Sequence, residues 1–191
     1  MTAMFSWQAD GSRGLESARV LLGDGGMRAL GRMVRAPLDA PAFTASYRLF
    51  VDEQGVLARL SVTSATAERE RNLTLNHTED GYWLLDTGAG GSRAEFDGAL
   101  DVDLQYSPLY NALPIRRTRL HREPVDHQLP IVFVSLPTLE VELASQRYRT
   151  LSTLDSDGRA VVSFSWETFA ADIVVDTDGM VIEYPGLANR I

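Results

Sequence analysis

Apolar and polar residues alternate with a period of two along most of the chain. Tyr47, Leu49 and Val51, for example, occupy alternate positions of one segment. Runs rich in Gly and Asp interrupt this alternation at hairpin intervals, at residues 23–26, 52–55, 78–81, 155–158 and 176–179. Such turns between alternating segments are typical of antiparallel strands joined in hairpins. The pattern therefore predicts an all-β, mostly antiparallel domain with little helix.

Several stretches depart from the alternation. The glycine-rich residues 88–91 predict a flexible loop between two halves of one domain. Residues 108–114 begin and end with proline and are too short for more than one helical turn, which favours a 3₁₀ corner or a tight loop. Residues 115–120 have an extended pattern, and the polar residues 121–128 predict an exposed loop.

A weak internal repeat accompanies the hairpins. Residues 46–57 and 170–181 align without gaps, and each contains a Val-Asp-x-x-Gly turn. This similarity fits two similar halves, but the sequence requirements that all hairpin turns share would also produce it.

Composition narrows the class of protein. The 191 residues are 45% hydrophobic and 23% charged, as expected of a single globular domain over residues 1–191. A formal net charge of −8 disfavours nucleic acid and anionic membrane surfaces as partners, since both attract basic proteins. No segment approaches the ~20 apolar residues that cross a bilayer, and the first residues lack a signal-peptide pattern. We therefore expect a soluble cytoplasmic protein.

Side-chain chemistry is also restricted. There is no cysteine, which excludes disulfides and thiolate chemistry, and all 18 basic residues are arginine, which excludes lysine-based mechanisms.

Three segments, residues 83–85, 131–134 and 173–175, are apolar at successive positions. A strand with one solvent-exposed face would alternate, so each segment is expected to cover two dry surfaces. The second surface is either a packed interior or the wall of a lipid-sized cavity. The candidate wall residues are Trp83, Leu85, Val132, Val134 and Val174.

Residues 100–120, LDVDLQYSPLYNALPIRRTRL, resemble the signature of the bacterial putative glycolipid-binding family. Residues 134–141 with 146–148, and residues 175–187, resemble two further blocks of that family. The resemblance extends from Trp7 to the end of the chain. Ser107, Leu109 and Tyr110 depart from the residues more usual at their positions. The resemblance implies a spiral β-roll, an open half-barrel akin to lipoprotein-localisation carriers, that binds a lipid or glycolipid.

Polar residues of the central block and of residues 146–148 form a candidate ligand-binding rim: Asp101, Asp103, Asn111, Arg116, Arg117, Gln146 and Tyr148. The two aspartates and two arginines are predicted to share one hydrogen-bonded cluster beside residues 108–114. Arg–carboxylate pairs would make this cluster a structural clasp. The same donors and acceptors also suit sugar hydroxyls or a lipid headgroup, and both interpretations stay open.

Catalytic interpretations are weaker. Asp101 and Asp103 could approach the ~5 Å separation of a retaining glycosidase, but no sugar cleft is indicated. His77, His121 and His127 lack metal-ligand spacing and are expected to be solvated. We therefore expect a non-catalytic protein that needs no metal or organic cofactor. It is either a lipid- or glycolipid-binding protein with an apolar cavity and a polar rim, or an interaction or structural β module with a fully packed core.

Overall fold

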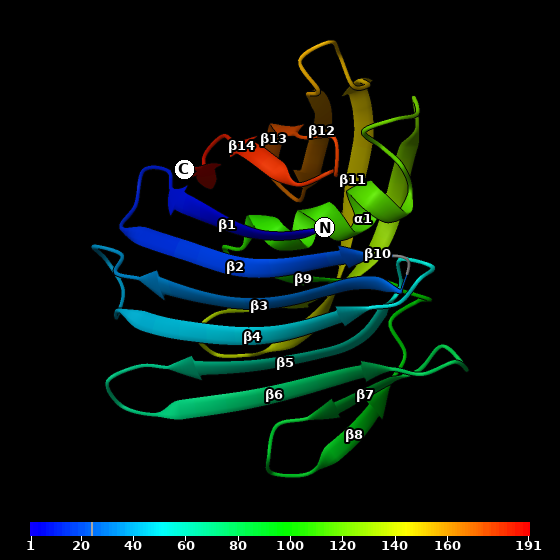
Figure 1. Ribbon diagram of the computed structural model, residues 1–191. Coiled ribbons are helices and arrows are strands. Elements are labelled where there is room, and N and C mark those ends of the chain that lie inside the picture. Colours follow the sequence, from blue (N-terminus) through cyan, green and yellow to red (C-terminus); the bar gives the residue numbers. More distant parts are fainter. Residues whose placement is uncertain (24) are drawn as a thin grey trace.

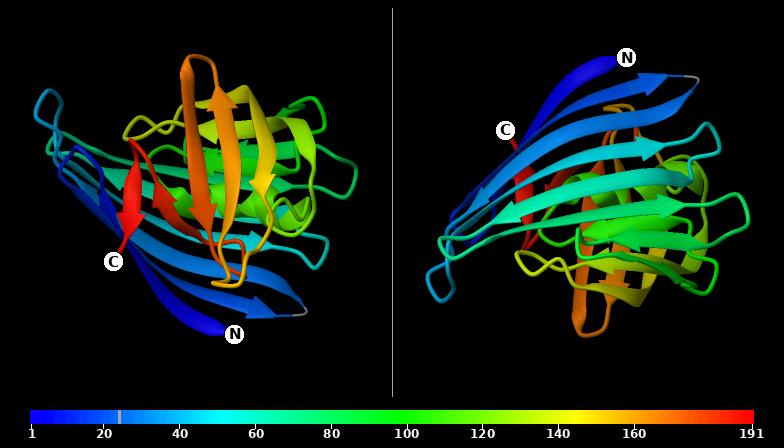
Figure 2. Two further views of the ribbon diagram at one scale, coloured as in Figure 1. Left: turned by 90° about the horizontal axis from the view of Figure 1, so that it is seen from above. Right: turned by 90° about the horizontal axis from the view of Figure 1, so that it is seen from below.

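One large open sheet forms most of the molecule. The computed structural model describes residues 1–23 and 25–191. In this part of the chain, fifteen strands hydrogen-bond in the order β8-β7-β6-β5-β4-β3-β2-β1-β15-β14-β13-β12-β11-β10-β9. The sheet curls around one helix, α1 (Pro108–Arg117), and its two halves enclose the helix from opposite sides (Figures 1 and 2).

The first half is termed the front wall. Its strands are β1 (Thr2–Ala9), β2 (Gly14–Gly23), β3 (Gly26–Arg35), β4 (Phe43–Val51), β5 (Leu57–Ala65), β6 (Glu70–His77), β7 (Trp83–Asp86) and β8 (Gly91–Ala94).

The second half is termed the rear wall. Its strands are β9 (Asp101–Leu104), β10 (Asp126–Val134), β11 (Val141–Ser152), β12 (Ala160–Trp166), β13 (Phe169–Val175), β14 (Val181–Tyr184) and β15 (Ala188–Arg190).

The predicted all-β architecture and its hairpins are confirmed. Neighbouring strands are antiparallel except β9 and β10, which are parallel. The predicted turns join β4 to β5, β6 to β7, β11 to β12 and β13 to β14. The first predicted turn joins β2 to β3, although its Asp24 lies outside the described residues. Residues 88–91 do not separate two halves; they turn β7 directly into β8.

The internal repeat corresponds to two similar turns. Asp52 accepts the backbone N–H groups of Gln54 and Val56, and Asp176 accepts those of Asp178 and Met180. The same type of turn, held by an aspartate side chain, accounts for the internal repeat in the sequence.

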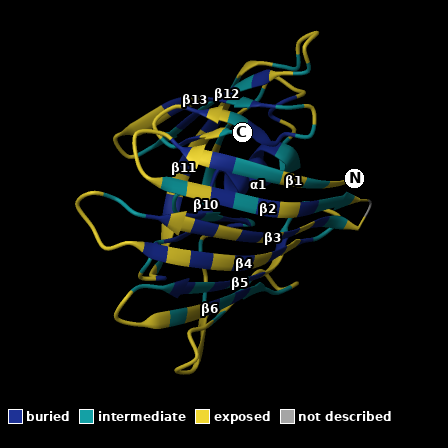
Figure 3. Cartoon of the chain, turned by 60° about the vertical axis from the view of Figure 1, so that its left-hand side comes forward, coloured by how far each residue is buried: buried dark blue, intermediate teal, exposed yellow. Residues whose placement is uncertain are grey.

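Burial follows the predicted period of two on the front wall. Along β4, buried and exposed residues alternate without interruption from Phe43 to Val51 (Figure 3). The buried positions face α1 and supply most of the larger core cluster. The face of β1–β6 that is turned away from α1 is termed the outer face.

The three fully apolar segments behave differently from one another. Residues 131–134 of β10 are buried on both sides, as predicted, and the ring of Phe133 lies 4.5 Å from that of Trp166. In β7, however, Leu84 is 43% exposed, so residues 83–85 do not cover two dry surfaces. In β13, Val174 is half-buried.

The prediction for residues 108–120 is wrong. Residues 108–117 form an α-helix, not a tight corner, and residues 118–120 form turns instead of a strand. Pro108 occupies the first helical turn, where no backbone N–H partner is needed. Pro114 lies inside the helix and costs about 3 kcal/mol. Burial of eight of the ten helical residues offsets that cost.

The helix is required by the topology. Parallel strands cannot be joined by a tight turn and need a crossover connection. Because β9 and β10 are parallel, α1 supplies that connection and lies across the inside of the roll. Just before β9, the carbonyls of Ala99 and Leu100 accept hydrogen bonds from Trp83 Nε1 at 3.1 Å and the Leu57 N–H at 3.0 Å. The segment that leads into β9 is therefore hydrogen-bonded to β5 and β7 of the front wall.

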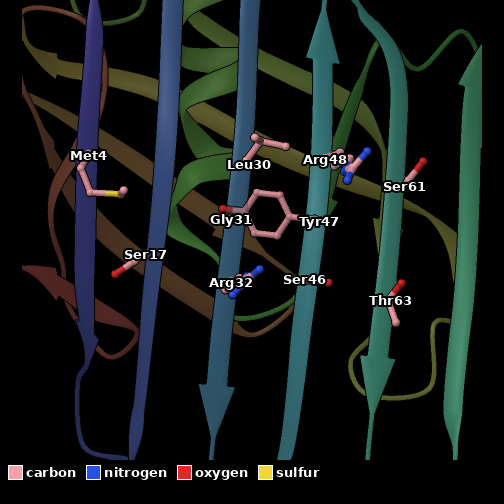
Figure 4. A pocket seen from close by; sticks show the side chains of 10 residues that line it. All are labelled: Met4, Ser17, Leu30, Gly31, Arg32, Ser46, Tyr47, Arg48, Ser61 and Thr63. Carbon is pink, nitrogen blue, oxygen red and sulfur yellow. The ribbon is translucent and has the colours of Figure 1, made fainter.

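A glycine lets one side chain cross beneath a strand. Gly31 of β3 pairs with Tyr47 of β4, and the Tyr47 ring lies against Gly31 (Figure 4). A Cβ atom on Gly31 would lie 2.0 Å from Cζ of Tyr47. Only glycine therefore lets the Tyr47 hydroxyl pass under β3.

We expect Gly31→Ala to destabilise the protein by about 1–3 kcal/mol, because the added methyl overpacks the core against Tyr47. Urea unfolding measures the change. Gly23→Ala is the control, since a Cβ at Gly23 would meet no atom within 4 Å. Equal stability of the two variants would contradict the close approach.

Candidate functional site

The predicted polar residues divide into separate contacts. Asp101 of β9 forms a buried ion pair with Arg117 at the end of α1, with 2.5 Å between Arg117 Nη2 and Asp101 Oδ2. Burial raises the pKa of Asp101 even though hydrogen bonding and charge attraction from Arg117 lower it. This pair fastens the C-terminal end of α1 to the rear wall.

Asp103 starts a second network. Gln146 Nε2 donates to Asp103 at 2.7 Å, the Tyr148 hydroxyl donates to Gln146 at 2.9 Å, and Asn111 Nδ2 donates to Tyr148 at 3.0 Å. Burial raises the pKa of Asp103 to about 6. The chain of bonds joins α1 to β9 and β11 inside the roll.

Arg116 contacts neither aspartate of the central block. It donates to the backbone carbonyl of Asp178 in the turn between β13 and β14. The prediction that Asp101, Asp103, Arg116 and Arg117 share one cluster is therefore wrong, because adjacent positions on a helix point in different directions.

The predicted wall residues lie mostly in the core. Trp83 and Val132 are 0% exposed, as is Val134, and all three belong to the cluster around α1. A side chain lining a cavity that admits water would have accessible surface, so these three face packed atoms. Leu85 and Val174 are half-buried, and Leu85 packs against the same core. Whether any of the predicted rim or wall residues touches a ligand stays a prediction.

Sequence reasoning missed a buried carboxyl group at the centre of the roll. Glu16 of β2 is 2% exposed. Its Oε1 accepts hydrogen bonds from the Tyr47 hydroxyl at 2.5 Å and the Ser107 hydroxyl at 2.6 Å. Burial raises its pKa from 4.5 to about 7, although both hydrogen bonds and the charge of Arg35 lower it. Glu16 thus links the front wall to the N-terminal end of α1.

Two polar atoms near this centre lack partners within the described residues. They are Glu16 Oε2 and the hydroxyl of Tyr110, whose ring lies 5.3 Å from that of Tyr47. A protonated Glu16 at neutral pH reduces the cost of leaving Oε2 buried.

The histidine prediction is also partly wrong. His121 is buried beside Arg116 and Arg122, and burial, followed by the Arg122 charge, lowers its pKa. His77 is half-buried against Trp83, with 5.1 Å between ring centroids.

The outer face carries a hollow of about 640 Å³ (Figure 4). A second hollow of about 510 Å³ adjoins it and shares Ser17, Arg32, Ser46 and Thr63. The first hollow is lined by both short and long side chains. Its lining residues are Met4, Ser17, Leu30, Gly31, Arg32, Ser46, Tyr47, Arg48, Ser61 and Thr63.

Strand register explains why these residues meet. One row of directly paired positions crosses β1 to β6 and is polar throughout: Ser6, Ser17, Arg32, Ser46, Thr63 and Asn72. Hydrogen bonds within the row join Ser6 to Ser17 and Thr63 to Asn72, each at 2.7 Å. The residues are far apart in sequence, so only the register of six strands reveals the row.

The hollow offers a specific set of contacts. Hydroxyl groups both donate and accept hydrogen bonds, and arginine donates several in a plane. Met4 and Leu30 add exposed apolar surface at its border. Such a mixture suits a polyhydroxylated group that carries an apolar substituent.

The fold defines a class of open, curled β-sheet proteins built around a crossover helix. Within this class, the chain belongs to the family described as "Putative glycolipid-binding", whose model matches residues 4–190. The resemblance found in residues 100–120 is thereby confirmed.

Two solved structures are similar. A DUF1089 family protein from Pseudomonas aeruginosa has 27% sequence identity and a TM-score of 0.76, over 97% of this chain and 95% of that one. A beta-barrel-like protein of the domain of unknown function DUF1849 from Brucella abortus has 10% identity and a TM-score of 0.56, over 99% and 93%. The second similarity concerns the fold alone. No curated protein matches the chain.

Two features are absent from the described residues. No helix there has the length and apolar character needed to cross a membrane. No group of three or more His, Asp or Glu side chains there is arranged to hold a metal ion.

We expect the buried carboxyl groups of Glu16 and Asp103 to make the unfolding free energy fall as pH rises from about 4 to 8, while buried His121, whose pKa is lowered, acts in the opposite direction. The folded-state pKa values of Glu16, about 7, and Asp103, about 6, exceed the ordinary values, so the folded protein retains protons that the unfolded chain has released. The shift of Glu16 corresponds to about 3 kcal/mol. Urea unfolding across this range measures the slope. Glu16→Gln should make this fall smaller, and exposed Glu142→Gln should leave it unchanged. A pH dependence that Glu16→Gln does not alter would refute the buried, protonated Glu16.

We expect Arg117→Met to destabilise the protein by about 3–5 kcal/mol, because Asp101 keeps a buried charge without its partner. The matched control is Arg147→Met. Arg147 and its partner Asp126 are 54% and 41% exposed, so its loss should cost less than about 1 kcal/mol. Thermal unfolding compares the two, and similar losses would show that the Asp101 pair does not hold α1.

Proposed function

We propose that the protein binds a glycolipid without catalysis, and that the carbohydrate headgroup occupies the outer-face hollow. The observation that carries the proposal is the polar row of β1–β6, of which Ser17, Arg32, Ser46 and Thr63 line that hollow. The family description supports the ligand class.

The hollow suits a sugar ring in chemistry and size. Ser46 and Thr63 supply hydroxyls on adjacent strands, which are spaced about 5 Å apart, and Ser17 supplies a third hydroxyl two strands away from Ser46. Arg32 lies between Ser17 and Ser46 in the same row and supplies guanidinium donors. A volume of about 640 Å³ falls within the range of small-ligand sites.

The inside of the roll is a less suitable location. The predicted wall residues Trp83, Val132 and Val134 are fully packed, and the polar residues of the central block bind one another. An acyl chain placed there would have to displace core side chains, which costs several kcal/mol. We therefore place only the headgroup on the protein and leave the acyl chains outside the roll.

Ser46→Phe tests the site by filling the hollow with an exposed ring. The probe is a phospholipid nanodisc of phosphatidylcholine that contains galactosyl diacylglycerol, and the readout is binding by surface plasmon resonance. Wild type should prefer these discs to pure phosphatidylcholine discs, and Ser46→Phe should bind them at least about tenfold more weakly, equivalent to about 1.4 kcal/mol.

Ser163→Phe on β12 is the matched control, because it makes the same change at a half-buried position of the rear wall. It should bind like wild type. Equal binding by both variants would place the headgroup elsewhere. Absence of any preference for glycolipid would favour the interaction module with a packed core.

A further inference from the structure

The outer face carries five exposed arginines: Arg19, Arg28, Arg32, Arg48 and Arg59. Strand register places them together. Arg19 and Arg48 both pair with Leu30, while Arg28 and Arg59 both pair with Phe50. Within the described residues, none of the five forms an ion pair with a carboxylate.

The charge of the protein is therefore strongly segregated. The outward-facing positions of β1–β5 contain no Asp or Glu, and Glu70 on β6 marks the edge of the basic region. The whole chain carries a formal charge of −8, so setting these five positive charges aside leaves −13 on the remainder. Such a dipolar arrangement turns the basic face toward an anionic surface and the rest away from it.

Exposed apolar side chains lie among the arginines. Those on this side of β1–β7 are Met4, Leu15, Leu30, Val34, Phe50 and Leu84. Apolar groups next to unpaired arginines are typical of surfaces that lie in a membrane interface, where guanidinium groups reach phosphates and apolar groups reach the acyl boundary. A single-stranded nucleic acid would instead favour several aromatic platforms, and Phe50 is the one aromatic ring among these exposed residues.

We infer that the outer face of β1–β6 docks onto the surface of an anionic lipid bilayer. The five arginines contact lipid phosphates, and the exposed apolar side chains rest at the headgroup boundary. This inference deepens the proposed function, since it places the hollow directly against the membrane from which a glycolipid headgroup would enter it. The net charge of −8 does not reveal this surface, because a net charge averages over both sides of the molecule.

Vesicle sedimentation tests the inference without any glycolipid. The probes are vesicles of phosphatidylcholine alone and vesicles that also contain phosphatidylglycerol. Wild type should bind only the anionic vesicles, and added salt should weaken binding because the charges are exposed. The triple variant R32Q/R48Q/R59Q should bind about a hundredfold more weakly, as each surface arginine contributes about a factor of five.

The control triple variant is R147Q/R149Q/R159Q, which has the same net charge but alters exposed arginines of β11 and of the turn that precedes β12. It should bind like wild type, with thermal unfolding confirming that both variants fold. Equal losses of vesicle binding in both triple variants would show that net charge alone determines binding, which would overturn the inference. Absence of wild-type binding to anionic vesicles, or tighter binding to single-stranded RNA, would overturn the inference. The Ser46→Phe experiment uses neutral glycolipid, whereas this experiment uses anionic vesicles without glycolipid. A failure of headgroup binding can therefore be distinguished from a failure of membrane docking.

Discussion

The buried carboxyl group of Glu16 fixes the arrangement on which the rest of the structure depends. It accepts hydrogen bonds from Tyr47 of the front wall and from Ser107 at the start of α1. The helix is thereby held against one wall while the Asp101–Arg117 pair holds its other end to the second wall. Gly31 is part of the same arrangement, since it gives Tyr47 room to reach Glu16. The sheet curls around α1 because these contacts attach the helix to both sides.

This anchoring determines where a ligand can bind. The helix and its polar contacts fill the inside of the roll, so the interior acts as a core. The same strands that face α1 on one side present the hydroxyl row and the arginines on the other. Strand alternation thus divides the front wall into a structural face and the face on which we propose that a ligand binds. In that proposal, the open, curled sheet binds a lipid headgroup without enclosing the acyl chains.

The sequence was sufficient for features that depend on neighbouring residues. The period-two alternation and the aspartate–glycine turns predicted the hairpins, and the central block predicted the family. The α1 helix was missed because Pro108 and Pro114 suggest a turn, whereas the parallel β9–β10 pair requires a crossover. Glu16 and the hydroxyl row were missed for a different reason. Their partners lie on other strands and before α1, and the period-two alternation gives the face of each residue but not the exact pairing of residues across six successive strands.

The most direct test of headgroup binding on the outer face is NMR of the arginine side chains. The Nε–Hε signals would be followed while nanodiscs containing anionic lipid and glycolipid are added to the wild-type protein. We expect the signals of Arg32 and Arg48, which line the hollow, to shift or broaden first. The signals of Arg147 and Arg159, which lie outside the front wall in exposed ion pairs, should stay unchanged. Changes confined to Arg147 and Arg159, or to Arg117 at the end of α1, would contradict headgroup binding on the outer face.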